Sequence, residues 1–170
     1  NFDRTVVYML DHGEQGAVGV VLNRAVDDEP DESFDSLDAL SAWEPLLAPP
    51  RRVFVGGPVA TDALIALATG DGRHDDAWGP VTDEVGTVDL SMTPDEVADR
   101  IDRVRIFRGY AGWGPGQLES EIDAGAWMVF DVADGDLFTA APDELWRTVV
   151  RRQGGRLAWI ADAPDDLSAN

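Results

Sequence analysis

Residues 5–22, Thr5-Val-Val-Tyr-Met-Leu-Asp-His-Gly-Glu-Gln-Gly-Ala-Val-Gly-Val-Val-Leu22, carry the pattern on which the fold prediction depends. Residues 5–10 and 16–22 are apolar runs rich in β-branched side chains, with a short polar segment between them. Two such runs about five residues apart predict neighbouring strands joined by a turn. We expect residues 11–13 to end the first strand. The fold therefore begins with two strands side by side.

Outward from this pair, strand-like and helix-like patterns alternate irregularly. Short apolar runs predict strands at 53–55, 106–110, 126–132 and 157–160. Helical spacing predicts helices after Asp35, over 93–104, over 117–123 and from Pro142. The run 63–68 fits a helix and a strand equally well, 69–80 reads as an exposed loop, and 163–170 reads as a loose polar tail. Adjacent strands without a regular βαβ series favour a mixed sheet in a single α/β (α+β) domain spanning 1–170.

The helix over 93–104 has the clearest signals of any predicted element. Thr93 is placed to cap it, Pro94 occupies the first helical position, and Glu96 completes a capping box. Apolar residues at helical spacing supply the buried stripe: Val97, Ile101 and Val104.

Composition excludes several classes of chemistry. The chain has 170 residues, enough for one core, and it has no cysteine, so disulfides and thiolate sites are excluded. Its 13 basic residues are all arginine, which excludes a Schiff-base lysine. No apolar run is long enough to span a membrane, and a cytoplasmic location is expected.

The net charge of −20 disfavours direct nucleic-acid binding, because the field of the protein repels phosphates. Two interpretations of this acidity stay open: solubility, including adaptation to high salt, or an acidic surface made for a basic partner. We expect the arginines of 103–108 and 147–156 to pair with acids on neighbouring elements.

Residues with catalytic or metal-binding chemistry are few. His12 and His74 are the two histidines, and their spacing to acidic residues matches no zinc or calcium pattern. His12 as a general base would need a nucleophile, and no Gly-x-Ser-x-Gly elbow supplies one. His12 and Asn23, each at the end of a predicted strand, are polar candidates only. The sequence predicts no catalytic residue, no cofactor and no metal.

Two glycine-rich turns are the best candidates for a binding surface. The first follows the strand at 53–55, and the second joins the strand at 106–110 to the helix at 117–123. Trp113, set between glycines, is expected to be exposed for recognition. The candidate surface consists of Gly56, Gly57, Pro58, Gly109, Tyr110, Gly112, Trp113, Gly114 and Gln117.

Taken together, these segments resemble one known family. Asn1-Phe-Asp-Arg-Thr-Val-Val-Tyr-Met-Leu-Asp-His12, Gly16-Ala-Val-Gly-Val-Val-Leu-Asn-Arg24 and Val55-Gly-Gly-Pro-Val59 resemble segments of the YqgE/AlgH family. So do Arg108-Gly-Tyr-Ala-Gly-Trp-Gly-Pro-Gly-Gln-Leu-Glu-Ser-Glu-Ile122, Gly125-Ala-Trp127, Asp136-Leu-Phe138 and the helix around Trp146. The resemblance covers nearly the whole chain.

The resemblance implies a small bacterial cytoplasmic protein with a curved sheet and about three to four helices packed on it. No catalytic residues are established in the family, so none is carried over. Some members are labelled transcriptional regulators, which we interpret as an indirect, pathway-level effect. Family members usually carry another short strand before the Asn-Phe motif, and we expect that strand to be missing here.

Three functional hypotheses follow. The leading one is a non-enzymatic regulatory or interaction module that binds another protein through the candidate surface. The alternative is a small-molecule-binding protein or enzyme with a pocket near Trp113, Gln117 and His12. Direct DNA binding is third, because the charge of the chain opposes it.

Overall fold

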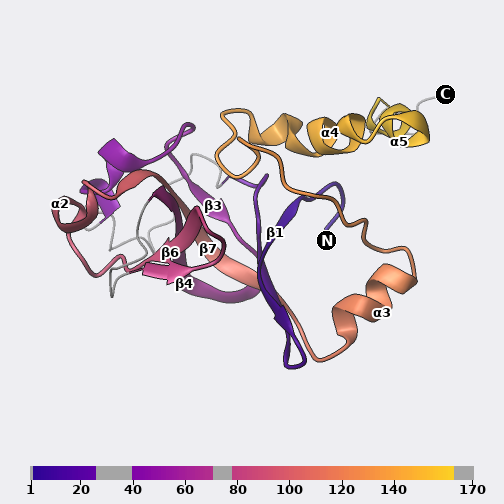
Figure 1. Cartoon of the computed structure of the whole chain (residues 1–170), viewed down its shortest axis with the longest axis horizontal. Helices are drawn as coiled ribbons and strands as arrows, with labels where there is room; N and C mark the ends of the chain where they lie inside the picture. Colours follow the sequence, from indigo (N-terminus) through magenta and orange to yellow (C-terminus); the bar gives the residue numbers. More distant parts are fainter. Residues whose placement is uncertain (1, 26–39, 71–77, 163–170) are drawn as a thin grey trace.

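The computed structural model describes residues 2–25, 40–70 and 78–162, which form one sheet with helices around it (Figure 1). The strands are β1 (Val7–Gly13), β2 (Gly16–Val21), β3 (Val53–Val55), β4 (Val59–Gly70), β5 (Trp78–Pro80), β6 (Val85–Val88) and β7 (Ile101–Trp113). Their order is β1-β2-β7-β4-β6-β5, and β3 also pairs with β7. The β3–β7 pairing is parallel and the others are antiparallel. The predicted α+β domain with a curved, mixed sheet is confirmed.

The described part of the chain also holds α2 (Pro94–Val97), α3 (Gln117–Asp123), α4 (Pro142–Arg152), α5 (Gly155–Ala161) and a short 3-10 helix, η1 (Glu44–Leu46). The four α-helices agree with the predicted three to four. Figure 1 shows α4 and α5 as an arm along one side of the molecule, with α3 beyond β1. Leu145 and Val149 of α4 join the core cluster that contains Phe54 and Phe107, which anchors the arm.

Strand β7 is the centre of the sheet. Its residues 101–108 pair with β4, and residues 106–108 also pair with β3. Its last three residues, 111–113, pair with β2 instead. Gly109 lies at the register shift of the β4 pairing, between Arg108 and Tyr110, which pairs with Val59, and its φ of 69° is a left-handed value that favours glycine. The strand thus links the two halves of the curved sheet through a glycine.

The long helix predicted over 93–104 is wrong. Its start is correct, because Pro94 opens α2 and the Thr93 backbone N–H donates to the Glu96 carboxylate over 2.8 Å. The helix ends at Val97, and Ile101 already begins β7. Pairing along β4 supplies more backbone hydrogen bonds and burial than a surface helix would, so tertiary context overrides the local propensity.

Two predicted strands near the C-terminal side are also wrong. Residues 157–160 lie in α5, which packs against α4; a four-residue apolar run does not distinguish helix from strand. Residues 126–132 form no strand, because no other described strand lies against them. A strand needs a hydrogen-bonding neighbour, and apolar β-branched composition alone does not supply one.

Other boundaries differ by smaller amounts. β1 continues through residues 11–13 because a register shift between Met9 and Asp11 keeps it paired with β2. The ambiguous run 63–68 is part of β4, and residues 78–80 of the predicted loop form β5. The helix predicted after Asp35 lies mostly outside the described residues, as does the tail 163–170. That the short strand before the Asn-Phe motif is missing here stays a prediction.

Some arginines form ion pairs with acids, whereas Arg105 bonds to backbone carbonyls. Arg151 pairs with Asp162, and Arg152 donates to both Asp136 carboxylate oxygens over 3.0 and 2.8 Å, as expected. Arg105 differs from the prediction, because it is 1% exposed and donates to backbone carbonyls. Burial, and then the nearby charge of Arg103, lower the pKa of Arg105 to about 10. Arg105 therefore joins the chain at Pro49 to the segment 137–139 through their backbone carbonyls.

Candidate functional site

The residues with the densest side-chain interactions lie where β7 passes into α3. Trp113 ends β7, and Gly116, with a φ of 72°, is the N-cap residue directly before α3. Gln117 and Glu121 are four residues apart, so they share the helix face that meets Trp113. Gly125, with a φ of 77°, follows α3 and turns the chain so that Trp127 returns to the same place. We call Phe2, Trp113, Gln117, Glu121 and Trp127 the aromatic clasp.

Glu121 is the hydrogen-bonding centre of the aromatic clasp. Its Oε2 accepts from Nε1 of Trp127 over 2.7 Å and from Nε1 of Trp113 over 3.0 Å. Its Oε1 accepts from Nε2 of Gln117 over 2.9 Å, and Gln117 Oε1 accepts from the Gly114 backbone N–H over 3.0 Å. The hydrogen bonds from Trp127, Gln117 and Trp113 lower the pKa of Glu121, because they favour the carboxylate.

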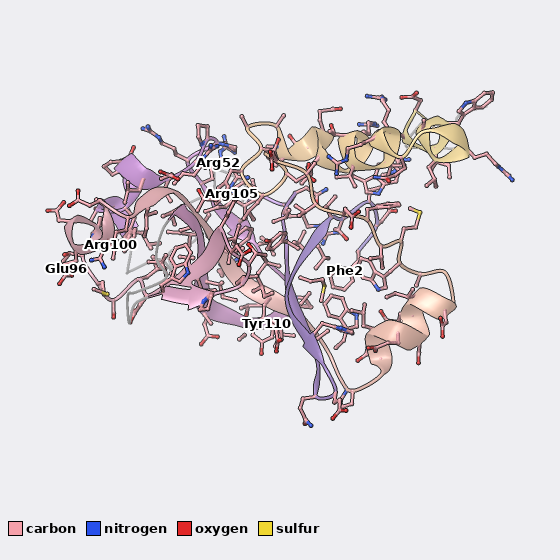
Figure 2. All side chains as sticks on the ribbon, viewed as in Figure 1. Phe2, Arg52, Glu96, Arg100, Arg105 and Tyr110 are labelled. Carbon is pink, nitrogen blue, oxygen red and sulfur yellow. The ribbon has the colours of Figure 1, made fainter. Side chains whose placement is uncertain are left out.

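Aromatic packing closes the other side of the clasp. The Phe2 ring lies 5.4 Å from the Trp127 ring and 6.5 Å from the Trp113 ring, measured between centroids. Trp113 and Trp127 meet edge to face at 5.8 Å. Figure 2 shows Phe2 on the side of β1 that faces α3. The clasp joins the N-terminal end, β7, α3 and the segment after α3. Both carboxylate oxygens of Glu121 accept hydrogen bonds from other residues of the clasp.

His12, near the end of β1, contacts Glu119 of α3. Its Nε2 is 2.6 Å from Glu119 Oε1, and both side chains are about half exposed, at 53% and 50%. The Glu119 backbone N–H and then His12 lower the pKa of Glu119. No hydroxyl group contacts His12 in the part of the chain that the structure describes. This pair attaches the β1 end to α3 and lacks the nucleophile that base catalysis would need.

Asn23 supports the backbone of the N-terminal turn. Its Oδ1 accepts from the Val6 backbone N–H, and its Nδ2 donates to the Arg4 carbonyl, each over 2.9 Å. Arg4 has a φ of 49°, a left-handed value that costs energy for a residue with a side chain. The Arg4 guanidinium lies 5.0 Å from the centroid of a Trp146 ring. Asn23 thus fixes a strained turn that sets Arg4 against α4.

A cavity of about 330 Å³ lies at this place, lined by Asp3, Arg4, Asp143, Trp146 and Arg147. This is not the place that the sequence predicted for a pocket, because the cavity lining does not include Trp113, Gln117 or His12. Arg147 is also 3.7 Å from Glu144 of α4. The cavity walls therefore carry cations and carboxylates together.

The first predicted glycine turn packs, backbone on backbone, against β7 around Gly109, at the β7 end of the second predicted turn. The Gly56 N–H donates to the Arg108 carbonyl over 2.8 Å, and the Val21 N–H donates to the Gly56 carbonyl over 2.8 Å. Gly56, Gly57 and Gly109 are buried, so they build the junction and present no side chain to a partner.

The rest of the predicted surface is divided between buried and exposed residues. Pro58, Gly112, Gly114 and Gln117 are exposed, and Tyr110 is half-buried. Trp113 is 8% exposed, so the expectation that it is exposed for recognition is wrong. Its indole N–H is directed at Glu121, and burial against Phe2 and Trp127 outweighs the exposure that flanking glycines suggest.

Exposed apolar side chains are found elsewhere. Met128, Val129 and Val132 are 49%, 73% and 59% exposed in the link between α3 and α4, and Trp159 and Ile160 on α5 are 83% and 47% exposed. Within the described residues, no backbone group of 127–132 bonds to another backbone group. We call residues 127–132 the unpaired segment.

The central role of Glu121 and the contributions of Phe2 and Trp127 were not predicted from the sequence. A detectable signal existed: Trp113, Gln117 and Glu121 are spaced four residues apart, and indole donors need acceptors when buried. His74 lies outside the described residues. Among those described, no three His, Cys, Asp or Glu side chains are grouped as metal ligands, and no helix is long and apolar enough to cross a membrane.

Comparisons with known proteins give a consistent result. A family model described as AlgH-like matches residues 1–158. A UPF0301 protein from Streptomyces avermitilis is 45% identical over 175 residues, covering 100% of this chain and 88% of the relative. A UPF0301 protein from Thermobifida fusca is 41% identical over 180 residues, with the same coverage of 100% and 88%.

Solved structures agree with this similarity. The crystal structure of a Corynebacterium diphtheriae protein matches with a TM-score of 0.81 at 25% identity, covering 92% of this chain and 81% of that one. The solution structure of the AlgH protein from Pseudomonas aeruginosa matches with a TM-score of 0.66 at 28% identity, covering 98% and 87%.

Proposed function

This chain belongs to the AlgH-like protein family, and we propose that it acts as a protein-interaction module without catalytic activity of its own. The observation that carries the proposal is the group of exposed apolar side chains on the unpaired segment and on α5. Trp159 is the main one, because its side chain is 83% exposed and tryptophan is enriched among the residues that dominate binding energy at interfaces.

The internal bonding of the candidate polar residues also supports an interaction role. Glu121, the carboxylate best placed to act as an acid or base, accepts three side-chain hydrogen bonds, and its lowered pKa keeps it ionised near neutral pH. Asn23 is engaged with two backbone groups, and His12 is engaged with Glu119. These groups stabilise the fold, and the exposed apolar side chains have no such role among the residues that the structure describes.

Quantitative affinity purification from an extract of the host bacterium tests the proposal. Wild-type protein and two variants, Trp159→Ala and Val59→Ala, serve as bait. Val59 is 37% exposed on β4, so its truncation is a matched control for removing an exposed apolar side chain. We expect a partner that the wild type and the Val59 variant both capture and the Trp159 variant loses. Equal capture by all three baits would contradict the proposal.

A small-molecule role has one observation in its favour, the cavity of about 330 Å³ beside Arg4 and Trp146. Its two guanidinium groups, its two carboxylates and its aromatic wall suit a planar ligand that carries both an anionic and a cationic group. A thermal melt against nucleotides, sugars, metabolites and divalent metals tests this role, because a ligand at a hundred times its Kd stabilises the fold by about 2.7 kcal/mol. A shift that Trp146→Ala removes would favour the small-molecule role over the interaction role.

A further inference from the structure

α5 exposes two large apolar side chains, whereas the residue that it buries is an alanine. Ala161 is fully buried, and Trp159 and Ile160 are 83% and 47% exposed. An amphipathic surface helix normally turns its large apolar side chains toward the core. Arg156 is exposed as well, and it lies three and four positions before Trp159 and Ile160, so the three share one side of the helix. We call Arg156, Trp159 and Ile160 the α5 face.

The chain around the α5 face holds it in place. Gly154 and Gly155 have φ values of 70° and 55°, which are left-handed and form the corner between α4 and α5. After this corner α5 packs against α4, and Arg151 of α4 pairs with Asp162, directly after α5. A surface that is already ordered loses little conformational entropy when a partner docks on it.

The α5 face lies at the end of the arm that α4 begins (Figure 1). The N-terminal residue Arg4 reaches the arm on the other side of the glycine corner, where it lies 5.0 Å from a Trp146 ring. Within the described residues, no side chain of the α5 face takes part in an ion pair, a ring contact or a buried cluster. The face is therefore open to a partner in the part of the chain that the structure describes.

The arm differs in charge from the rest of the chain. Of the 13 basic and 33 acidic residues, residues 142–162 hold four arginines and three acids, which leaves nine basic and thirty acidic residues elsewhere. Arg147, Arg151 and Arg152 each lie within ion-pair distance of a carboxylate of the chain. Arg156 has no such carboxylate among the described residues. The α5 face thus offers an unpaired cation beside an exposed indole ring.

Resting on the proposed interaction function, we propose that the α5 face binds an acidic segment of a partner protein. An apolar side chain of this segment packs on Trp159 and Ile160, and a carboxylate beside it pairs with Arg156. The planar guanidinium of arginine matches the two oxygens of a carboxylate. Tryptophan and arginine are also the residue types that most often dominate the binding energy of an interface.

The charge of the rest of the chain gives this contact its specificity. A basic partner is attracted to acidic residues over the whole surface, so charge does not direct it to α5. An acidic partner is repelled from those surfaces, and at physiological ionic strength the repulsion is largely screened beyond about 8 Å. A second copy of the chain brings the same net charge of −20 and no carboxylate on its α5 face, so it is disfavoured as the occupant.

Nuclear magnetic resonance of the indole N–H groups of the folded chain tests the proposal. The probe is a synthetic ten-residue peptide with leucine and phenylalanine at its centre and glutamates on both sides. We expect it to shift the Trp159 signal in a saturable way, and the signals of Trp113 and Trp127, whose indoles donate to Glu121, to stay unchanged. The Trp159 signal is the one that Trp159→Ala removes. Added salt should weaken the binding, because it screens the ion pair.

Two control peptides separate the two parts of the recognition. A peptide with lysine in place of glutamate should leave the Trp159 signal unchanged, even where it binds acidic residues elsewhere. A peptide with serine in place of leucine and phenylalanine should also leave it unchanged, because one exposed ion pair contributes little. An equal Trp159 shift with the lysine peptide would overturn the acidic character of the partner.

Three variants assign the binding to the α5 face. Arg156→Glu should lower the affinity for the glutamate peptide about fivefold or more and should let the lysine peptide shift Trp159. Arg51→Glu is the matched control, an exposed arginine outside the arm, and should change the affinity by less than about twofold. Trp159→Ala, measured by isothermal titration calorimetry, should lower the affinity about tenfold or more. Unchanged circular dichroism spectra establish that the variants are folded.

Each other outcome overturns the inference. An unchanged Trp159 signal excludes the acidic segment, and a partner captured by Arg156→Glu but lost by Trp159→Ala in the affinity purification would then still support the proposed function. A Trp159 signal that shifts with protein concentration alone identifies a second copy as the occupant. Peptide binding that requires deletion of residues 163–170 identifies the chain's own tail. A shift caused only by vesicles of anionic phospholipid identifies a lipid surface.

Discussion

Gly109 and Gly57 are packed backbone against backbone at the bend of β7. A Cβ atom built on Gly109 would lie 2.6 Å from the Gly57 carbonyl oxygen and 2.9 Å from that of Val59. Side-chain carbons do not approach carbonyl oxygens this closely without displacement. The bend that joins the two halves of the sheet therefore depends on the absence of side chains at both positions.

Gly109→Ala is expected to destabilise the protein severely. The left-handed φ of 69° and the overlap with the backbone act together, and a combined cost of roughly 2–5 kcal/mol follows. Urea unfolding measures this cost. Gly13→Ala is the control, because a Cβ there meets no atom within 4 Å, and its stability should stay close to that of the wild type. Equal stabilities for the two variants would show that the junction is not tightly packed.

Trp113→Ala and Trp159→Ala should have opposite consequences. Trp113 is 8% exposed and hydrogen-bonded to Glu121, so its truncation should cost about 3–5 kcal/mol. Trp159 is 83% exposed, so its truncation should change the free energy of unfolding by no more than about 0.5 kcal/mol. Thermal and urea unfolding of the two variants measure the contrast. A large loss for Trp159→Ala would mean that α5 is part of the core.

The aromatic clasp should make stability depend on pH through Glu121. Its pKa is lowered in the folded protein, so the stabilisation is complete above the unfolded value of about 4.3 and is lost as pH falls through the folded value. Glu121→Gln keeps the shape and removes the charge. The wild type should exceed this variant in stability at pH 7, and the difference should shrink on acidification below about 4.

Urea unfolding at neutral and acidic pH measures this difference. Asp123→Asn, an exposed acid at the end of the same helix, reports the general effect of removing one negative charge from α3. A wild-type advantage over Glu121→Gln that stays constant with pH would show that the indole hydrogen bonds do not favour the carboxylate.

Arg105→Met should destabilise the protein although methionine suits a buried site. Arg105 donates to the carbonyls of Pro49, Leu137 and Thr139 over 2.6, 3.0 and 2.9 Å, and its guanidinium lies 4.5 Å from the Phe54 ring centroid. Figure 2 labels Arg105, which lies on β7. The substitution leaves the buried Leu137 carbonyl unsatisfied, at about 1–3 kcal/mol, and removes two part-buried hydrogen bonds that water can replace in part.

Arg156→Met provides the matched control for this prediction. Arg156 is exposed on α5, so its substitution should change stability by less than about 0.5 kcal/mol. Chemical unfolding of both variants measures the difference. If Arg105→Met were as stable as the wild type, water or a rearranged backbone would have replaced the guanidinium.

Local sequence signals located much of the fold. The first two strands, β3 and α3 were predicted at nearly their observed positions, because each has an apolar run or helical spacing bounded by glycine, proline or polar residues. The Thr93–Glu96 capping box was also correct, since it involves residues within one turn. Local signals do not predict pairing between strands. Ile101 and Val104 have helical spacing, yet they pair with β4 and lie in a strand.

The sequence by itself determined that the chain is one α+β domain with a mixed sheet, and that glycine is needed where β3 and β7 are followed by turns. Those properties follow from short-range sterics and from periodic burial. Only the tertiary structure decided that Trp113 is buried and that Glu121 receives both indole N–H groups. Only the tertiary structure showed that residues 127–132 pair with no other strand in the described part of the chain. Hydrogen-bond partners far apart in sequence are chosen by three-dimensional proximity, on which local composition carries no information.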